Sequence, residues 1–323
     1  MVEPEAMRLS NSTGAVARLH MVDFLEPQRR AVVIVKKTYA VAEDGTLGTV
    51  SDPMPFVPLQ LATGFGSFHG EFFFRKRGVD LCVLGTVQLD EPVRRMRVRL
   101  EVGGWSHELE VTGDRVWVDD GTPELKPSDP TPFVEMPISY GRAFGGSADV
   151  GGAEVPWTDN PEGVGYYESR ELAIGKPLPN LTTPGAAASR WDDRQRVVGW
   201  GPYPMYWGLR AARAVSLDRQ RGEIIDITPE LFNHAHPDLI LECIRPLTPI
   251  RVDLGARPFE LRVPSERPCV DVRVGTGVFE ALGDLDGLFL WPNARRLVVT
   301  WRARFRYPVR AEEVRQASLS FVA

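Results

Sequence analysis

The sequence contains few cysteines and no reactive arrangement of them. Only Cys82, Cys243 and Cys269 occur in 323 residues, and no two have the CxxC spacing. An odd number of widely spaced cysteines argues against a disulfide framework and against a cysteine zinc site. We therefore expect a reducing compartment. The apolar, strand-like sequence around the cysteines predicts buried, inert thiols.

Long apolar runs are also missing. No stretch of about 18 apolar residues occurs, and the first residues lack the basic and apolar regions of an export signal. These absences predict a cytoplasmic protein without a membrane span. The net charge of −5 argues against general affinity for nucleic acid or anionic membranes, and it slightly favours a basic partner.

No motif for nucleophilic or nucleotide chemistry is present. The Gly-x-Ser-x-Gly elbow and the Gly-Lys-Ser/Thr phosphate loop are both missing, and residues 141–146 do not match a dinucleotide fingerprint. We therefore expect no catalytic residues and no cofactor. Paired carboxylates for glycoside cleavage stay open, because 43 acidic residues allow many pairs. Together with exposed aromatic residues, they make a carbohydrate- or cell-wall-acting hydrolase the alternative to a binding protein.

Two short patterns resemble metal-binding sequences. His234 and His236, near Asp238, offer two imidazoles and a carboxylate, but the other three histidines are scattered along the chain. Asp284 and Asp286 stand in a glycine-bracketed segment without the further oxygen ligands of a calcium loop. We expect structural or solvent-facing histidines, a plain turn and no metal.

Strand-like segments fill both ends of the chain and predict a mainly β fold of antiparallel, β-sandwich-like lobes with few short helices. Residues 1–120 are expected to form an N-terminal lobe and residues 209–323 a C-terminal lobe, although the whole chain could be one compact domain. Residues 228–235 are the expected short helix, and residues 282–290 the expected turn before the last hairpin. The segments from residue 81 onward are expected to form a meander. The expected strands are 30–41, 81–89, 94–102, 108–111, 116–118, 240–243, 250–254, 259–263, 269–274, 277–280 and 296–306.

The middle of the chain, residues 121–208, is rich in proline, glycine and aromatic residues and has little periodicity. A disordered linker would be poor in aromatic residues, so we expect ordered loops packed across the sheets, with residues 182–194 as a mobile excursion. In the preceding strand, Arg95, Arg97 and Arg99 alternate with apolar residues. This alternation favours a solvated outer sheet face over a groove for an acidic partner.

Residues 133–146 are the most informative segment. Gly145 and Gly146 allow positive φ or close backbone approach, and Phe144 is a large apolar anchor. Arg142 is expected either to pair with a buried carboxylate and hold the middle to the sheets, or to bind a partner's carboxylate. We favour the structural role.

A series of such motifs resembles domain of unknown function family 2169, bacterial proteins typically encoded beside type VI secretion spikes and effectors. Residues 31–39 look like the opening strand of that family, and residues 297–302 look like its closing strand. The family's usual glutamate before Arg142 is replaced by Gly141, and residues 214–218 have diverged. The matching motifs are Arg142-Ala143-Phe144-Gly145-Gly146, Asn160-Pro161, Leu178-Pro179-Asn180-Leu181, Gly199-Trp200-Gly201-Pro202, and Trp207 with Arg210.

The resemblance implies a non-enzymatic adaptor or chaperone that binds a toxic type VI secretion effector and helps to load it onto the VgrG spike protein. It implies protein partners and no catalytic centre, and we expect partner contacts on aromatic residues and arginines of residues 133–210. The alternatives are the hydrolase named above and a structural component of the spike. The candidate structural or partner-binding residues are Arg142, Phe144, Gly145, Gly146, Asn160, Pro161, Trp200, Trp207 and Arg210.

Overall fold

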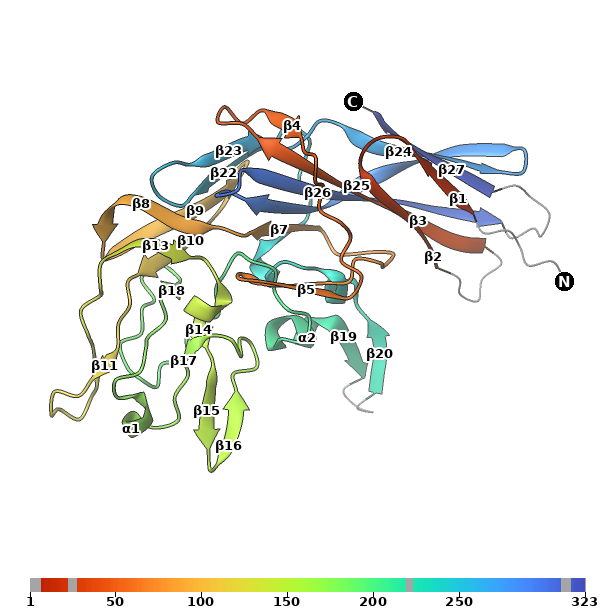
Figure 1. Ribbon diagram of the computed structural model, residues 1–323. Helices are drawn as coiled ribbons and strands as arrows, with labels where there is room; N and C mark the ends of the chain where they lie inside the picture. The colour runs from red at the N-terminus through yellow and green to blue at the C-terminus, as the bar shows by residue number, and fades with distance from the viewer. Residues whose placement is uncertain (1–6, 23–27, 219–222, 309–314, 323) are drawn as a thin grey trace.

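A ten-stranded sheet forms the largest part of the computed structural model, which describes residues 7–22, 28–218, 223–308 and 315–322 (Figure 1). Its main path runs β1-β27-β24-β25-β26-β3-β2, and β4, β7 and β21 pair with strands of this path or with each other. The pairs β1–β27 and β7–β25 are parallel. The strands are β1 (Arg8–Asn11), β2 (Val16–Val22), β3 (Gln28–Val41), β4 (Leu47–Thr49), β7 (Val79–Val83), β21 (Ile240–Leu241), β24 (Arg267–Val274), β25 (Gly277–Trp291), β26 (Arg296–Pro308) and β27 (Arg315–Val322).

Strand β3 shows why the large sheet holds together. Residues 31–35 are Ala-Val-Val-Ile-Val, and all five are fully buried. A continuous buried run is typical of a strand that is covered on both faces. β3 pairs with β26 along the whole length of β26, so both ends of the chain contribute to one sheet. The predicted strands at residues 30–41 and 296–306 are confirmed.

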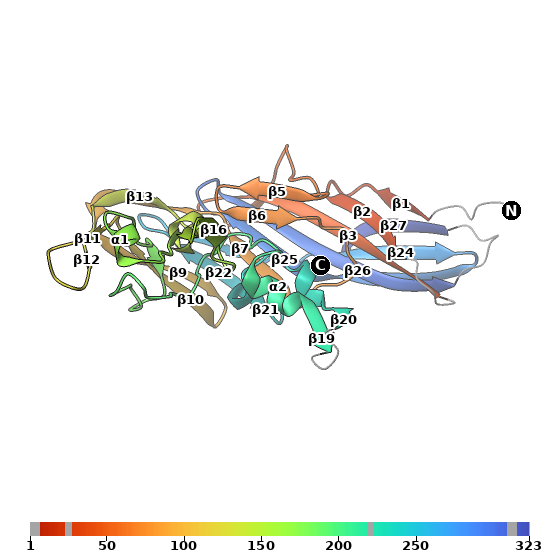
Figure 2. The same cartoon turned by 90° about the horizontal axis from the view of Figure 1, so that it is seen from below.

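A five-stranded sheet lies beside the large one, and the two share one hydrophobic core. On its strand β9 the arginines at 95, 97 and 99 are exposed, whereas Val98 and Leu100 are buried, which confirms the predicted solvated face. Figure 2 shows the elongated molecule with the two sheets toward opposite ends. The order is β18 (Leu181–Thr182), β10 (Trp105–Thr112), β9 (Arg95–Val102), β22 (Pro249–Asp253) and β23 (Phe259–Arg262).

The strand predicted at residues 81–89 is divided into β7 and β8 (Thr86–Val93). The chain leaves the large sheet at Gly85, where an added Cβ would lie 2.5 Å from Leu254 Cδ1. β8 then pairs with β13 (Phe133–Pro137) instead of β9. The predicted meander is therefore wrong except for the β9–β10 hairpin, because periodicity identifies strands but not their partners.

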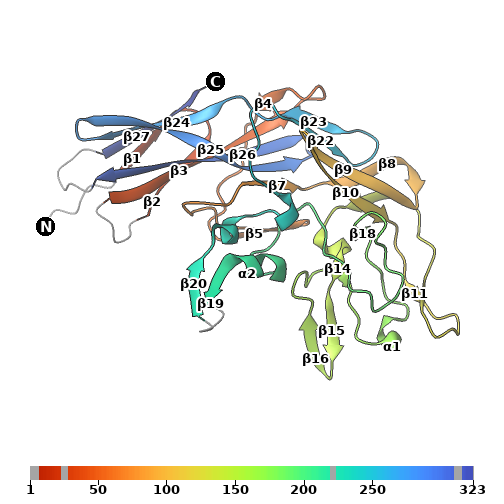
Figure 3. The ribbon, with the colours of Figure 1, turned by 180° about the vertical axis from the view of Figure 1, so that it is seen from behind.

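The middle of the chain forms short pairs and loops on one side of the sheets, where the β15–β16 and β19–β20 hairpins also project (Figures 1 and 3). β11 pairs with β12, so the predicted turn at residues 113–114 does not form a hairpin between β10 and β11. The remaining elements are β5 (Gln60–Thr63), β6 (Gly66–His69), β11 (Trp117–Val118), β12 (Lys126–Pro127), β14 (Phe144–Gly145), β15 (Ser147–Val150), β16 (Ala153–Pro156), β17 (Val164–Gly165), β19 (Val215–Asp218), β20 (Glu223–Ile227), the helices α1 (Arg170–Ala173) and α2 (Gly208–Ala214), and the 3-10 helices η1 (Tyr140–Arg142), η2 (Pro229–Phe232) and η3 (Pro237–Leu239).

The mainly β fold with few short helices is confirmed, and no helix within the described ranges is long and apolar enough to cross a membrane. The helix predicted at residues 228–235 begins after Thr228, with Pro229 in its first turn, but ends at Phe232. The next residues leave the helix because their amides bond to a buried carboxylate, described below.

The turn predicted at residues 282–290 is wrong, because these residues belong to the continuous strand β25. Its pairing with β26 shifts between Leu285 and Gly287, so that Asp286 is the extra residue of a β-bulge. Glycine is needed at position 287 for packing, since an added Cβ would lie 2.5 Å from Thr300 Oγ1. The glycines and aspartates that suggested a turn therefore serve a bulge inside a strand.

Candidate functional site

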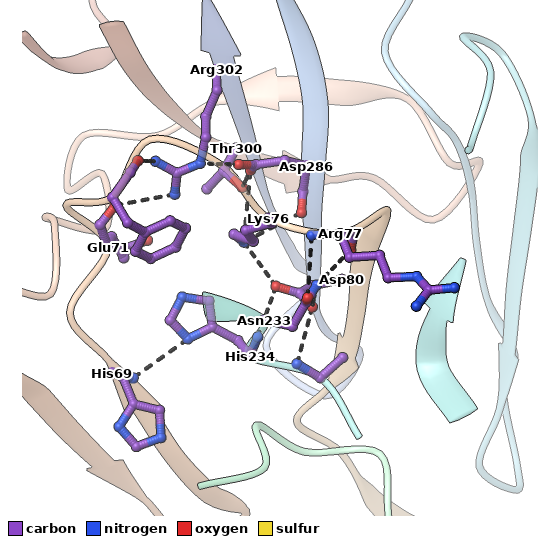
Figure 4. Close-up of polar contacts among 12 residues, drawn as sticks. His69, Glu71, Lys76, Arg77, Asp80, Asn233, His234, Asp286, Thr300 and Arg302 are labelled. Atoms are coloured by element: carbon purple, nitrogen blue, oxygen red, sulfur yellow. Dashed lines mark hydrogen bonds and ion pairs between the residues drawn. The ribbon is translucent and has the colours of Figure 1, made fainter. Parts of the chain in front are cut away.

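A group of buried polar side chains lies where β7, β25 and β26 meet the loop that follows β6 (Figure 4). Its members come from widely separated parts of the chain and are joined by hydrogen bonds and ion pairs. We call it the polar cluster, and its residues are Lys76, Asp80, Asn233, His234, Asp286, Thr300 and Arg302.

Asp80, on β7, is fully buried and ties two segments together. Its Oδ2 accepts hydrogen bonds from Lys76 Nζ and the His234 amide, both at 2.8 Å. Its Oδ1 accepts from Asn233 Nδ2 at 2.8 Å and from the Ala235 amide at 3.2 Å. A buried carboxylate is tolerated when such donors satisfy it, and here they occupy both oxygens. The arrangement suits Asp80 to hold residues 233–235 against β7.

The bulge in β25 brings a second carboxylate into the cluster. Asp286 Oδ1 accepts from Thr300 Oγ1 at 2.6 Å, and its Oδ2 forms an ion pair with Arg302. Lys76 Nζ lies 3.8 Å from Asp286 Oδ1, so Lys76 bridges Asp80 and Asp286 (Figure 4). Burial raises the pKa of Asp286, but the charges of Arg302 and Lys76 outweigh burial, and the pKa lies below its ordinary value.

A further buried pair fixes the loop that carries Lys76. Lys36 Nζ donates to Glu71 Oε2 at 2.6 Å, and the Val57 amide donates to the same oxygen at 2.6 Å. Arg302 donates to the carbonyls of Phe73 and Glu71 at 2.8 and 3.1 Å, and its guanidinium lies 4.0 Å from the Phe73 ring centre. Burial lowers the pKa of Lys36, although the charge of Glu71 acts in the opposite direction. The loop is thus held at several points.

The two histidines of the pattern that resembles a metal site are buried, and each accepts a structural hydrogen bond. His234 Nδ1 accepts from the His69 amide at 3.4 Å, and His236 Nδ1 accepts from the Asp238 amide at 3.2 Å. His69 Nε2 accepts from the Met205 amide at 2.6 Å. Burial lowers the pKa of His234 well below its ordinary value, and lowers those of His69 and His236 to about 4. Within the described ranges, no three His, Cys, Asp or Glu side chains form a group that could hold a metal ion.

A hollow of about 470 Å³ borders the polar cluster, and Lys76, Asp286 and Arg302 are part of its lining. We call it the first hollow. Cys243 also lines it and is exposed, whereas the other two cysteines are buried. The prediction of a buried thiol at this position is therefore wrong. β21 ends at Leu241, two residues before the predicted end of the strand, and Cys243 lies outside the sheet.

Arg142 has a different environment from the one expected. Its Nη1 donates to Asp114 Oδ1 at 2.9 Å and to Asn180 Oδ1 at 3.2 Å. The Arg142 side chain is 40% exposed and that of Asp114 is 68% exposed, so the expected buried carboxylate partner is wrong. The pair joins η1 to the connection between β10 and β11, and Asn180 Nδ2 reinforces it by donating to Asp114. Arg142 thus links the middle to the sheet at the surface.

The paired glycines after Phe144 close the backbone over Asn160. The fully buried Asn160 donates through Nδ2 to the carbonyls of Tyr140 and Phe144, at 2.8 and 3.0 Å. Gly145 has φ 151°, and an added Cβ would lie 2.0 Å from the Asn160 carbonyl oxygen. Gly146 has φ 97°, and its amide donates to the same oxygen at 2.9 Å. The predicted close backbone approach is confirmed at both glycines.

The later signature residues are buried and hold the middle of the chain to the elements around it. Trp200 Nε1 donates to His107 Nδ1 at 3.0 Å. Trp207 packs edge-on against Tyr203, with ring centres 5.1 Å apart. Arg210 Nη1 donates to the Tyr203 carbonyl at 2.7 Å, and its Nη2 donates to a carbonyl of η2. Burial lowers the pKa of Arg210 to about 10.

Of the eleven aromatic residues within residues 133–210, five are fully buried and cannot contact a partner, five are partly buried and one is exposed. Tyr206, with 60% exposure, lies open at the surface, and Pro161 is half-buried. The middle of the chain therefore uses its large rings mainly for internal packing. The fully buried rings are Tyr140, Phe144, Trp200, Tyr203 and Trp207.

The β5–β6 hairpin presents a strand edge that the sequence did not lead us to expect. β6 is covered on its outer side, since the Ser67 amide donates to the Pro202 carbonyl and the His69 amide donates to His234 Nδ1. In an antiparallel pair, residues opposite such outward-facing groups also direct their N–H and C=O outward. These residues are Ala62 and Gln60 of β5.

No strand pairs with the outer edge of β5 in the part of the chain that the structure describes. Two leucines stand at this edge, Leu59 with 83% exposure and Leu61 with 43%. Neither is part of the main hydrophobic core. The alternation of leucine with polar or small residues at positions 59–63 was the sequence signal for this strand, although it predicts no free edge.

Residues 26–302 match the sequence profile of DUF2169, which is described as an uncharacterized protein conserved in bacteria. The match includes both the polar cluster and β5. No curated protein and no solved structure matches the chain.

Proposed function

The chain is a member of the DUF2169 family, and we propose that it is a non-enzymatic adaptor. In this proposal it acts in the bacterial cytoplasm, without a cofactor, as a chaperone of a type VI secretion effector. It binds the effector and helps to load it onto a VgrG-type spike protein. Its partners are therefore the secreted effector and the spike protein.

The free edge of β5 is the observation that carries this proposal. The outward N–H and C=O groups of Gln60 and Ala62 can pair with an extended segment of a partner, and Leu59 and Leu61 offer apolar contacts beside them. Natural proteins usually protect an apolar edge strand with charges, proline or a covering loop, because an open edge pairs with other chains. An edge left open is therefore suited to binding a protein.

The hydrogen bonds of the polar cluster favour a structural role for its buried carboxylates. Asp80 has donors on both oxygens, and Asp286 faces two cations and a hydroxyl group. A general base needs a free acceptor position within reach of its substrate. These carboxylates are already occupied by the protein's own donors, which favours a framework for binding over a catalytic pair.

Co-purification of the protein with the effector encoded beside its gene tests the proposal. We expect the double variant Leu59→Asp/Leu61→Asp to reduce recovery of the effector by about tenfold or more, because it places two charges on the edge. The matched control is Val150→Asp/Val155→Asp, two exposed valines on the β15–β16 hairpin. The control should stay within about twofold of the unchanged protein.

The other outcomes would contradict the proposal in distinct ways. Loss of the effector only in the valine variant would place binding on the β15–β16 hairpin. If no effector co-purifies and the isolated protein cleaves peptidoglycan or another glycan, the adaptor proposal is wrong and the protein is a hydrolase.

A further inference from the structure

Two hollows of opposite charge lie next to each other on the surface. The first hollow, of about 470 Å³, lies among residues 75–79, residues 242–246 and the bulge of β25. The second, of about 840 Å³, lies between the β3–β4 turn and the β22–β23 hairpin. Both are lined by Val263, Pro264 and Glu266, so the two hollows adjoin at a shared wall, and we call them together the groove. Val263 and Pro264 are buried, so the accessible part of this wall is formed by Ser265, which is exposed, and Glu266, which is half-buried.

The first hollow has more cations than carboxylates. Asp284 pairs with Arg267 and Arg304, both at 2.7 Å. Glu266 is bound from outside the hollow by Lys37 at 2.6 Å. Against four carboxylates, the lining contains the six cations Arg75, Lys76, Arg245, Arg267, Arg302 and Arg304.

Two of these cations, Arg75 and Arg245, have no ion-pair partner among the residues that the structure describes, and both are exposed. Their guanidinium groups are therefore free to bind an external carboxylate, for which the planar donors of arginine are well suited. The hollow is positive in a protein whose net charge is −5.

The second hollow has the opposite balance. Within the described part of the chain its cations are Arg251, which pairs with Glu260, and Arg262, which donates to the Leu247 carbonyl at 3.2 Å. Its four carboxylates are Asp44, Glu101, Glu260 and Glu266.

Two of these carboxylates are paired from outside the hollow, Glu266 with Lys37 at 2.6 Å and Glu101 with Arg99 at 3.3 Å. Arg99 is shared with Glu108 and Arg251 is shared with Asp253, so the ion-pair networks of this hollow still contain more carboxylates than cations.

We propose that this groove binds an extended segment of the partner polypeptide that carries an acidic side chain for the first hollow and a basic side chain for the second. The inference rests on the proposed adaptor function and names the chemistry that the partner must present. Complementary charges on both sides of the shared wall would set the position of the segment and exclude segments of a single charge. Each hollow alone has the size of a small-molecule site, but their opposite signs and shared wall favour a chain that fills both.

The exposed Cys243 allows the first hollow to be tested without any partner. The purified protein is equilibrated with bis(2-carboxyethyl) disulfide and with cystamine, and mass spectrometry gives the fraction of each mixed disulfide at Cys243. We expect the carboxylate-bearing adduct to be favoured by about fivefold or more at low salt, because the guanidinium groups attract it. The preference should disappear in Arg75→Glu/Arg245→Glu and persist in the control Arg95→Glu/Arg97→Glu, whose arginines are exposed on β9. Equal adducts in the unchanged protein would overturn the proposal.

Labelled peptides test the whole groove by fluorescence anisotropy. The probes are Glu-Glu-Ala-Ala-Lys-Lys, its reversed sequence, and six-residue peptides with only glutamate or only lysine as charged residues. One of the two mixed peptides should bind about tenfold more tightly than either single-charge peptide, and Glu260→Lys should remove this advantage. Equal binding of all four peptides would contradict the groove. If none of the peptides binds while the effector still co-purifies, only the inference about the groove is wrong. If a mixed peptide binds and no effector co-purifies, only the adaptor proposal is wrong.

Discussion

At the scale of single residues, two ion pairs in this protein show how burial changes what a charge contributes. Lys76 and Asp80 are 2.8 Å apart with side chains that are nearly inaccessible to solvent. Arg142 and Asp114 are 2.9 Å apart, but their side chains are 40% and 68% exposed. Removing one partner of a buried pair leaves an unsolvated charge, whereas an exposed charge is simply rehydrated. Similar distances therefore predict very different effects of substitution.

We expect Asp80→Ala to destabilise the fold by about 3–5 kcal/mol, because Lys76 loses its nearest carboxylate. The amides of His234 and Ala235 also lose their acceptor. Urea unfolding followed by tryptophan fluorescence gives the free energy of unfolding. The double variant Lys76→Met/Asp80→Leu should recover part of this loss, since no charge is then left unpaired.

The exposed pair supplies the control. Arg142→Ala should reduce the free energy of unfolding by only about 1 kcal/mol or less, in contrast to the larger loss expected for a buried partner. A loss above about 2 kcal/mol would mean that the link between Arg142, Asp114 and Asn180 carries more of the fold than its exposure indicates.

The buried histidines predict how stability depends on pH. His69 and His236 have folded-state pKa values lowered to about 4 by burial, compared with an ordinary value of 6.5. Between pH 4 and pH 6.5 the unfolded chain therefore binds more protons than the folded protein. The contribution of these histidines to the free energy of unfolding is complete above pH 6.5 and is lost as the pH falls toward 4. Urea unfolding at pH 7 and pH 5 should show this loss, and His69→Gln should make it smaller. Equal stability at both pH values would contradict the assignment of neutral, buried imidazoles.

At the scale of elements, the sequence identified strands better than their connections. Residues 31–35 and 297–301 are apolar or β-branched runs, and the strands there were predicted almost to the residue. The bulge at Asp286 was missed because glycine and aspartate occur both in turns and in bulges. Only the register with β26 distinguishes the two. The free edge of β5 was missed because a sequence shows alternation but not which strands become neighbours.

The closure of β14 over Asn160 gives a prediction at this scale. Gly145→Ala should destabilise the fold by more than about 2 kcal/mol, because its Cβ would meet the Asn160 carbonyl and its φ is unfavourable for alanine. Gly104→Ala is the matched control, since an added Cβ there meets nothing within 4 Å. Thermal unfolding of both variants measures the difference. Similar melting temperatures for the two would show that residues 143–146 can move away from Asn160 at little cost.

At the scale of the whole molecule, the large sheet mixes the two ends of the chain. β3 pairs with β26, and β7 lies between β21 and β25. The predicted N-terminal and C-terminal lobes thus contribute to one sheet and one core. The sequence suggested two lobes because the strands cluster at both ends of the chain, with the irregular middle between them. Pairing across more than 200 residues leaves no local signal in the sequence.

This shared sheet predicts that the chain unfolds as one unit. Without residues 209–323, β3 loses the strand β26 that pairs with it, and without residues 1–208, β26 loses β3. Because buried apolar faces would then be exposed, residues 1–208 and 209–323 should each be insoluble or unfolded when expressed alone. For the full chain, tryptophan fluorescence and far-UV circular dichroism should give coincident urea transitions, although the tryptophans lie in both the middle and the large sheet. Co-expression of the two fragments as separate chains provides a control for solubility, because each would supply the strands that the other lacks. Two separated transitions, with the middle unfolding first, would instead show that residues 121–208 are held to the sheets too weakly to share their cooperativity.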